Sequence, residues 1–289
     1  MLEKLISAVD CHLADKGLPG LIKATGGLLA FGSVLGASFG SAVVTAAFLL
    51  AGALCVVGAL AVLARSRAVV HTKLLDREEL VGHYCDLIYD EIQPLWRIDR
   101  WEETAEVAPN GDVCASILVH AFVQRDQLGF YRVRLGPNFP QAPAVRRKVQ
   151  VDVTGIEVGE FRGDQCERTS RWLADGRLEV LVHFPADAPR KGEEVILRFE
   201  VRWPGKAAPL MLGRTDEFVM KMGNPLAYLR YRVTLPAGAS LRATPVDLDA
   251  EKDAYRLTTT TTSGGRPVAE LVAHDIAADR RFGMRLELA

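Results

Sequence analysis

The sequence lacks the short motifs by which many enzymes are identified. It contains no HExxH, no phosphate-binding loop with its lysine, and no GxGxxG between a strand and a helix. Each of these motifs fixes a metal ion or a phosphate group at one place in the chain. Without them no catalytic residue can be assigned from spacing, and the sequence predicts that the protein is not an enzyme.

Cysteine and histidine are few, and neither shows the pattern of a disulfide framework or a metal site. The five cysteines form no CxxC pair, whereas a disulfide framework needs an even, closely spaced set. The six histidines show no metal-ligand spacing. A lone histidine such as His120 or His183 is more often packed within a strand than bound to a metal. The sequence therefore predicts reduced cysteines, no metal and no cofactor.

The charge balance shows no excess of basic residues. Residues 1–75 carry six of the 35 Lys and Arg and three of the 36 Asp and Glu. This leaves 29 basic and 33 acidic side chains in residues 76–289, a net charge of −4. Because nucleic-acid-binding domains are usually basic, neither DNA nor RNA is an expected partner.

Charge is missing altogether from residues 24–64, a stretch of 41 residues with no Asp, Glu, Lys or Arg. A bilayer core about 30 Å thick is crossed by about 20 helical residues, so this run is long enough for two short spans. We therefore predict a transmembrane hairpin over residues 21–64. The alternative is a single span over residues 42–64, with the preceding glycine-rich part re-entrant or interfacial.

Glycine recurs every four residues in the first half of this run, at Gly32, Gly36 and Gly40. This spacing places the three residues on one face of a helix, where a second backbone can approach closely. The face is interpreted either as an oligomer seam or pore lining, or as packing within the hairpin. The expected partners are therefore the lipid bilayer and further copies of the same chain.

Basic residues lie on both sides of the uncharged run. Lys16 and Lys23 precede it and Arg65 follows it, so the positive-inside rule places both ends in the cytoplasm. Apolar spacing of three and four predicts an amphipathic helix over residues 1–20 and a helical stalk over residues 65–94. The expected localisation is the bacterial inner membrane, as a multi-pass protein with a cytoplasmic soluble domain.

The spacing of apolar residues changes after residue 95, from the three-to-four spacing of a helix to the alternation of a strand. Runs of alternating β-branched, aromatic and charged residues indicate half-buried strands, and turn signals such as Asp175-Gly176 separate them. We expect about a dozen strands in residues 95–289, forming a mainly β region that is one β-sandwich or two sandwich halves. A division is expected near residues 204–214. The clearest runs are residues 113–125, 177–184, 194–203, 226–235 and 255–262.

Two of the expected strands carry paired arginines beside aromatic residues. Arg132 and Arg134 share one face of FYRVRL, and Arg230 and Arg232 share one face of LRYRV. Arginine forks beside aromatic rings suit a phosphate-bearing small molecule, so these four are the candidate contacts for an anionic ligand. The alternative is that they belong to the solvated face of antiparallel strands.

A membrane hairpin followed by a cytoplasmic all-β domain resembles the two-transmembrane, β-rich effectors of bacterial antiphage (CBASS-like) systems. The resemblance rests on the order of the parts, which are the run 24–64 and the strands after Trp96. It implies a β domain that senses a nucleotide signal or a sensor protein, and membrane helices that assemble and permeabilise the inner membrane. A membrane-tethered binding or scaffold module is the alternative, and a tethered enzyme is the third interpretation.

Overall fold

The computed structural model describes two main stretches of the chain, helical residues 80–87 and the β region 95–288. Isolated helical positions are also described between residues 43 and 77. Within the β region the description omits residues 127, 138, 160, 164–166 and 185–188. The chain divides into two compact units, Met1–Arg77 and Glu78–Ala289.

Several predictions fall on the first unit. The amphipathic helix 1–20, most of the hairpin 21–64, and Gly32, Gly36 and Gly40 lie outside the described residues. Within the part of the chain that is described, no helix is both long and apolar enough to span a membrane.

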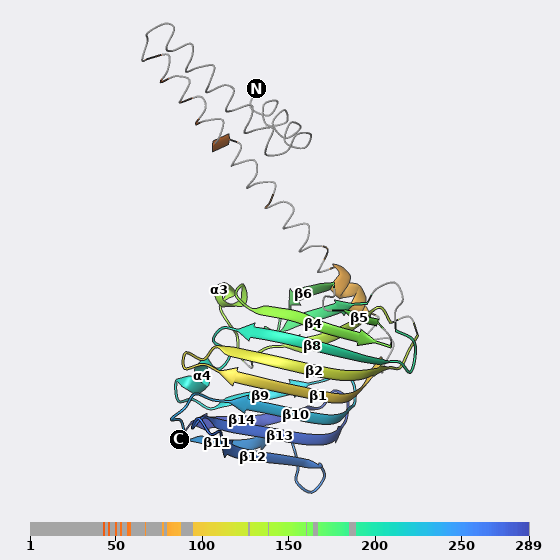
Figure 1. Cartoon of the computed structure of the whole chain (residues 1–289), viewed down its shortest axis with the longest axis vertical. Helices are drawn as coiled ribbons and strands as arrows, with labels where there is room; N and C mark the ends of the chain where they lie inside the picture. Colours follow the sequence, from red (N-terminus) through yellow and green to blue (C-terminus); the bar gives the residue numbers. More distant parts are fainter. Residues whose placement is uncertain are drawn as a thin grey trace. The chain divides into compact units, whose positions relative to one another are not determined.

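Most of the second unit consists of strands arranged in three sheets, which confirms the prediction of a mainly β region. The large sheet has eight strands and is antiparallel except where β1 and β10 run parallel. Figure 1 shows its strands stacked from β4 to β12. In spatial order they are β12 (Tyr255–Thr261), β13 (Pro267–Ile276), β10 (Leu226–Thr234), β1 (Trp96–Val107), β2 (Val113–Val123), β8 (Glu194–Trp203), β4 (Gln150–Val158) and β5 (Phe161–Gly163).

Two three-stranded sheets accompany the large sheet. One has the order β3 (Phe130–Leu135), β7 (Leu178–His183) and β6 (Arg168–Trp172). The other has the order β11 (Leu241–Val246), β14 (Arg281–Leu288) and β9 (Asp216–Lys221). The expected division near residues 204–214 falls on the short helix α4 (Ala208–Met211), which lies between β8 and β9 within one compact unit.

Both small sheets pack against the large sheet through aromatic side chains. Edge-on and tilted ring pairs of this kind contribute beyond the apolar area they bury. Because each small sheet touches different strands of the large one, the two form a second layer together. The ring pairs that join the layers are Trp96 with Tyr131 at 5.2 Å, Trp172 with Trp203 at 5.7 Å, and Phe218 with Tyr231 at 6.4 Å between centroids.

A bulge in β1 decides which of its side chains enter the core. The register between β1 and β2 shifts between Ile98 and Arg100, so the inward set changes phase at that point. Trp96 and Ile98 face inward before the bulge, and Trp101 and Glu103 do so after it. The bulge therefore turns the carboxylate of Glu103 into the buried layer between the sheets.

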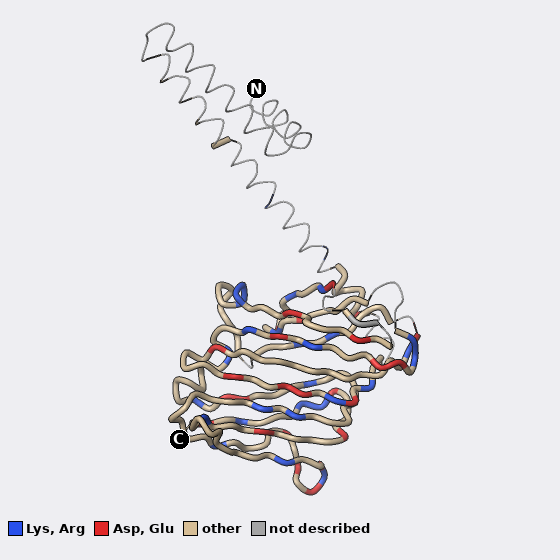
Figure 2. Tube along the Cα trace, viewed as in Figure 1, with Lys and Arg blue, Asp and Glu red and all other residues tan. Residues whose placement is uncertain are grey.

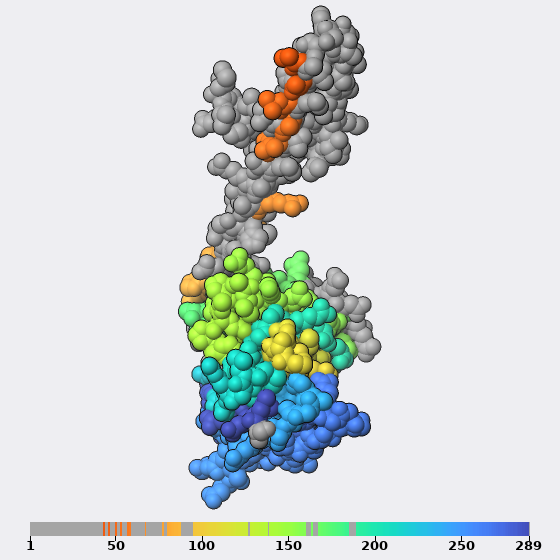
Figure 3. Space-filling model, turned by 90° about the vertical axis from the view of Figure 1, so that its left-hand side faces the viewer, coloured from red at the N-terminus to blue at the C-terminus, as the bar shows by residue number. Residues whose placement is uncertain are grey.

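Loops and short helices close one end of the β region. Figure 3 shows the α3 segment, the β1–β2 turn and the α4 segment side by side at this end. Asp112 in the turn accepts a hydrogen bond from the backbone N–H of Gly205 at 2.7 Å, and the Gln141 side chain donates to the carbonyl of Pro204 at 3.1 Å. The short helix α3 spans Pro143–Arg146.

Charged residues of both signs are distributed along the strands and turns (Figure 2). This mixture of signs along the trace agrees with the near-neutral composition.

Candidate functional site

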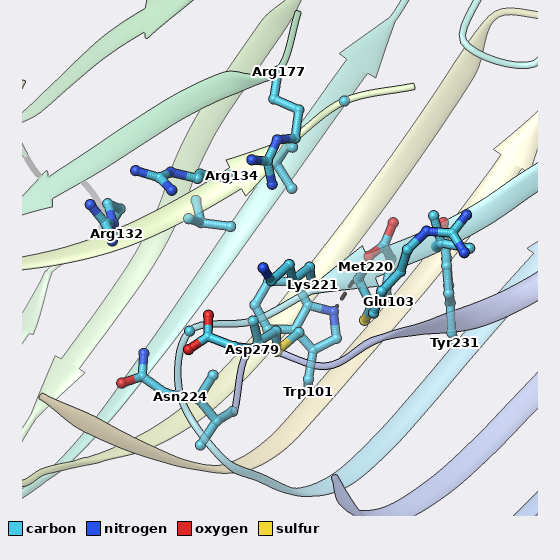
Figure 4. A pocket seen from close by; sticks show the side chains of 18 of the residues that line it. Trp101, Glu103, Arg132, Arg134, Arg177, Met220, Lys221, Asn224, Tyr231 and Asp279 are labelled. Carbon is cyan, nitrogen blue, oxygen red and sulfur yellow. Dashed lines mark hydrogen bonds between the residues drawn. The ribbon is translucent and has the colours of Figure 1, made fainter. Parts of the chain in front are cut away.

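A cavity of about 520 Å³ opens where the two small sheets meet the large one. Ligand sites typically have volumes of about 300–1,000 Å³. Its walls come from β3, from the end of β9, and from β1 and β10 of the large sheet. Figure 4 shows Arg132, Arg134 and Arg177 along one side of this cavity, with Trp101, Glu103 and Tyr231 across from them.

The floor of the cavity is aromatic and contains one buried carboxylate. Glu103 is 5% exposed and receives a hydrogen bond from Trp101 Nε1 at 3.4 Å. The parallel register places Glu103 beside Tyr231. The pKa of the Tyr231 phenol is raised, mainly by burial and secondly by the negative charge of Glu103. Lys206 Nζ lies 4.0 Å from Glu103 Oε1. The buried carboxylate of Glu103 is thus stabilised by the cation of Lys206 and by two hydrogen-bond donors, Trp101 Nε1 and the Tyr231 hydroxyl.

Basic side chains outnumber acidic ones in the lining of the cavity. Six of its lining residues are Lys or Arg and two are acidic, and the basic ones are Arg132, Arg134, Arg177, Lys206, Lys221 and Arg281. Five of the six have a carboxylate partner among the described residues, as Arg177 has in Asp175 at 2.6 Å. Lys221 is exposed and has no ion-pair partner among the described residues. Because a guanidinium carries five N–H donors, one carboxylate does not exhaust an arginine.

Arg132 and Arg134 also belong to an ion cluster beside the cavity. Its centre is Glu179 of β7, which is completely buried and accepts a hydrogen bond from Arg134 Nε at 2.8 Å. Arg171 of β6 donates to the other oxygen of Glu179, also at 2.8 Å. Asp86 of the 80–87 helix completes the cluster, at 2.7 Å from Arg132. Three arginines thus surround two carboxylates, with one net positive charge.

The structure separates the four predicted anion contacts into two pairs. Arg132 and Arg134 line the cavity on β3. Arg230 and Arg232 lie on the outward face of β10, because the inward positions of that strand include Tyr231. Arg230 pairs there with Glu270 at 2.9 Å. The two pairs of arginines do not form a common site.

Sequence reasoning missed most of the other groups at the cavity. Trp101 and Glu103 face inward only because of the bulge, and no turn residue marks it. A signal was nevertheless present in the spacing of five between Trp96 and Trp101, which breaks strict alternation. Lys221 and Arg177 lie at the ends of strands, where alternation does not define a face.

Asp216 is buried beside this site, and its carboxyl group has an unusually high pKa. Desolvation raises its pKa to about 6, against the opposing effects of the Glu217 N–H and the Lys206 charge. In the unfolded chain the carboxyl ionises near its ordinary pKa of about 3.9. The stability contributed by protonated Asp216 is therefore complete below about pH 4 and is lost as the pH rises to about 6.

We expect Asp216→Asn to abolish this pH dependence. The variant should gain stability relative to the native protein by up to about 3 kcal/mol as the pH rises from about 4 to 7, at 1.36 kcal/mol per pKa unit. Urea unfolding at several pH values measures the difference. Glu200→Gln, at an exposed outward position of β8, is the control and should show no such trend. Parallel pH profiles for native protein and Asp216→Asn would contradict the expectation.

Among the described residues, no group of three or more His, Cys, Asp or Glu side chains is arranged to hold a metal ion. The two cysteines described, Cys85 and Cys114, are both free thiols.

No protein-family model and no curated protein matches the chain. Solved structures that resemble it include a putative protease from Parabacteroides distasonis (9% identity, TM-score 0.46, 67% of this chain and 40% of the other). An M1 zinc metallopeptidase from Deinococcus radiodurans is similar at 15% identity and a TM-score of 0.40, over 68% and 43%. The leukotriene A4 hydrolase from Saccharomyces cerevisiae is similar at 8% identity and 0.36, over 67% and 29%. The chain thus spans less than half the length of each.

These findings correct three of the predictions. The similar structures are named as a protease, a metallopeptidase and a hydrolase, which contradicts both the membrane-permeabilising antiphage effector and the prediction of a non-enzyme. The multi-pass inner-membrane localisation is corrected as well, because the similar structures are named as a metallopeptidase and a hydrolase. The effector prediction relied on the order of the parts and the non-enzyme prediction on missing motifs, and neither feature records how strands are arranged. The localisation relied on the uncharged run 24–64 and its basic flanks.

Proposed function

We propose that the second unit binds a small organic oxyanion, a carboxylate or phosphate attached to an apolar or aromatic body, in the cavity between its sheets. The observation that carries this proposal is the combination of a basic rim with an aromatic floor. Six cationic side chains line a cavity whose floor includes Trp101 and Tyr231.

Each part of such a ligand finds a matching surface. Arginine and lysine at the rim form charge-assisted hydrogen bonds with an oxyanion, and these are about twice as strong as neutral ones. Trp101, Tyr231 and Met220 contribute to the apolar part of the lining, against which the body of the ligand can pack. The buried Glu103 at the floor disfavours an anion there, so the oxyanion end is directed to the rim.

Binding of three small probes to the full chain tests the proposal. We expect phenyl phosphate and benzoate to bind in isothermal titration calorimetry, and the neutral benzamide to bind more weakly than either. Lys221→Glu should weaken phenyl phosphate binding by roughly tenfold or more, since a hydrogen bond to a charged group contributes about 1.5–3 kcal/mol. Lys221 is exposed, so its reversal leaves the core intact.

Lys148→Glu is the matched control, because Lys148 is an exposed lysine that does not line the cavity. The same change of charge should leave the affinity within about twofold, because Lys148 makes no contact in the cavity and an exposed charge is screened by salt. Equal binding of benzamide and benzoate, or equal losses for the two lysine variants, would refute an oxyanion site at this cavity.

A further inference from the structure

The cavity and the 80–87 helix use the same two arginines. Arg132 and Arg134 line the cavity, and both donate to Oδ1 of Asp86, at 2.7 and 3.1 Å. Arg171 holds the second oxygen of Asp86. One carboxylate on the helix is therefore bound by three guanidinium groups of the β3–β7–β6 sheet.

The two carboxylates of the cluster differ in how easily they can be replaced. Glu179 is completely buried within its sheet, whereas the side chain of Asp86 is 32% exposed. Removing Glu179 would require opening the sheet. Asp86 can leave when the helix moves away, and water can then solvate its carboxylate. Of the two, Asp86 is the one that an incoming anion can displace.

The helix also packs closely at this point, which makes its docking sensitive to the cluster. A Cβ on Gly82 would come within 2.5 Å of the Arg171 guanidinium, so the glycine allows the helix backbone to approach the sheet. Cys85, one residue before Asp86, is buried in the same contact. Burial, with the nearby charge of Glu179, raises the pKa of its thiol to about 11.

Resting on the proposed oxyanion site, we infer that the ligand and Asp86 compete for Arg132 and Arg134, so that an anion bound in the cavity releases the 80–87 helix. Arg132 donates to Asp86 through Nη1 and Arg134 through Nη2, while Nε of Arg134 is held by Glu179, so an oxyanion that takes either of these Nη donors must take it from Asp86. Two anions at this position would also repel each other. Helix docking and ligand binding thus oppose each other, and linkage requires that each weakens the other by the same factor.

Two variants of the full chain loosen the helix by different means. Asp86→Asn removes the competing charge. Gly82→Ala changes no charge, but its Cβ requires a shift of the Arg171 guanidinium, which is bonded to Asp86 and Glu179. We expect both variants to bind phenyl phosphate about tenfold more tightly, within the range of about 5–150-fold typical of coupled sites. Asp152→Asn is the control, because it removes an equivalent carboxylate from an ion pair with Arg168, and neither residue lines this cavity.

Labelling of Cys85 by iodoacetamide, followed by mass spectrometry of its peptide, reports helix release directly. Saturating phenyl phosphate should accelerate this labelling about tenfold in the native chain, by the reciprocity of coupled equilibria. Cys114 is exposed and serves as the internal standard, whose rate should not change. Without ligand, Asp86→Asn and Gly82→Ala should already label faster at Cys85 than the native chain.

The outcomes separate this inference from the proposed function. If both helix variants bind phenyl phosphate as the native chain does, and the ligand does not change the rate of Cys85 labelling, the competition is refuted. The proposed oxyanion site would not be affected by that result. Failure of every variant to bind phenyl phosphate or benzoate would remove the site itself, and the competition with it. Tighter binding in Asp152→Asn equal to that in Asp86→Asn would reduce the effect to net charge and also overturn the inference.

Discussion

Replacing Glu179 by glutamine is expected to lower the free energy of unfolding by about 3–5 kcal/mol, the range measured when one partner of a buried ion pair is removed. Glu179 is completely buried and holds Arg134 and Arg171 through both of its oxygens. The amide keeps the shape of the side chain but not its charge, so the three arginines of the cluster would be left with Asp86 alone.

Urea unfolding of the native protein and Glu179→Gln gives the difference. The matched control is Glu270→Gln, which removes a carboxylate from the more exposed pair with Arg230 and should cost less than about 1 kcal/mol. A loss of similar size in both variants would show that the buried position of Glu179 adds nothing. An unfolding slope that changes along with the midpoint would instead indicate that the compactness of one state has changed.

The strands could be predicted from the sequence because their signal is local. Alternation of buried and exposed residues is visible in EVILRFEVRW, and β8 spans that segment. The same alternation correctly put Arg132 and Arg134 on one face of a strand. Which sheet each strand joins is not a local property, and Arg230 and Arg232 were therefore grouped with a site that lies on the opposite side of the large sheet.

The ion cluster could not have been predicted, because its members are far apart in the chain. Asp86 and Arg171 are separated by 85 positions, and Asp86 and Arg132 by 46. An aspartate on a helical surface is usually solvated, and nothing in its neighbours reveals a partner in a distant strand. The cavity depends in the same way on the bulge of β1, which turns Glu103 inward. Both features follow from tertiary packing, which local patterns do not encode.

A second large effect is expected at the closed end of the β region. Trp203, the last residue of β8, is 1% exposed and meets the Trp172 ring nearly edge-on, at an interplanar angle of 83°. Its Nε1 donates a hydrogen bond to Gln141 Oε1 at 2.7 Å. The side chain thus joins the large sheet to the β3–β7–β6 sheet and also holds the segment that leads into α3.

Trp203→Ala should lower the free energy of unfolding by about 3–5 kcal/mol, the range for truncation of a large aromatic residue in a core. The cost arises because the cavity left behind cannot close between two sheets, and because Gln141 loses its donor. Trp203→Phe keeps most of the packing, and its stability in urea unfolding should fall between those of the native protein and the alanine variant.

The control is Leu212→Ala, just beyond α4, where a 74% exposed side chain makes the expected change less than about 0.5 kcal/mol. Because Trp203 does not line the cavity, the folded Trp203→Phe protein should bind phenyl phosphate as the native protein does. Equal stability of the Trp203→Ala and Leu212→Ala variants would mean that the contact between the two sheets does not depend on this tryptophan.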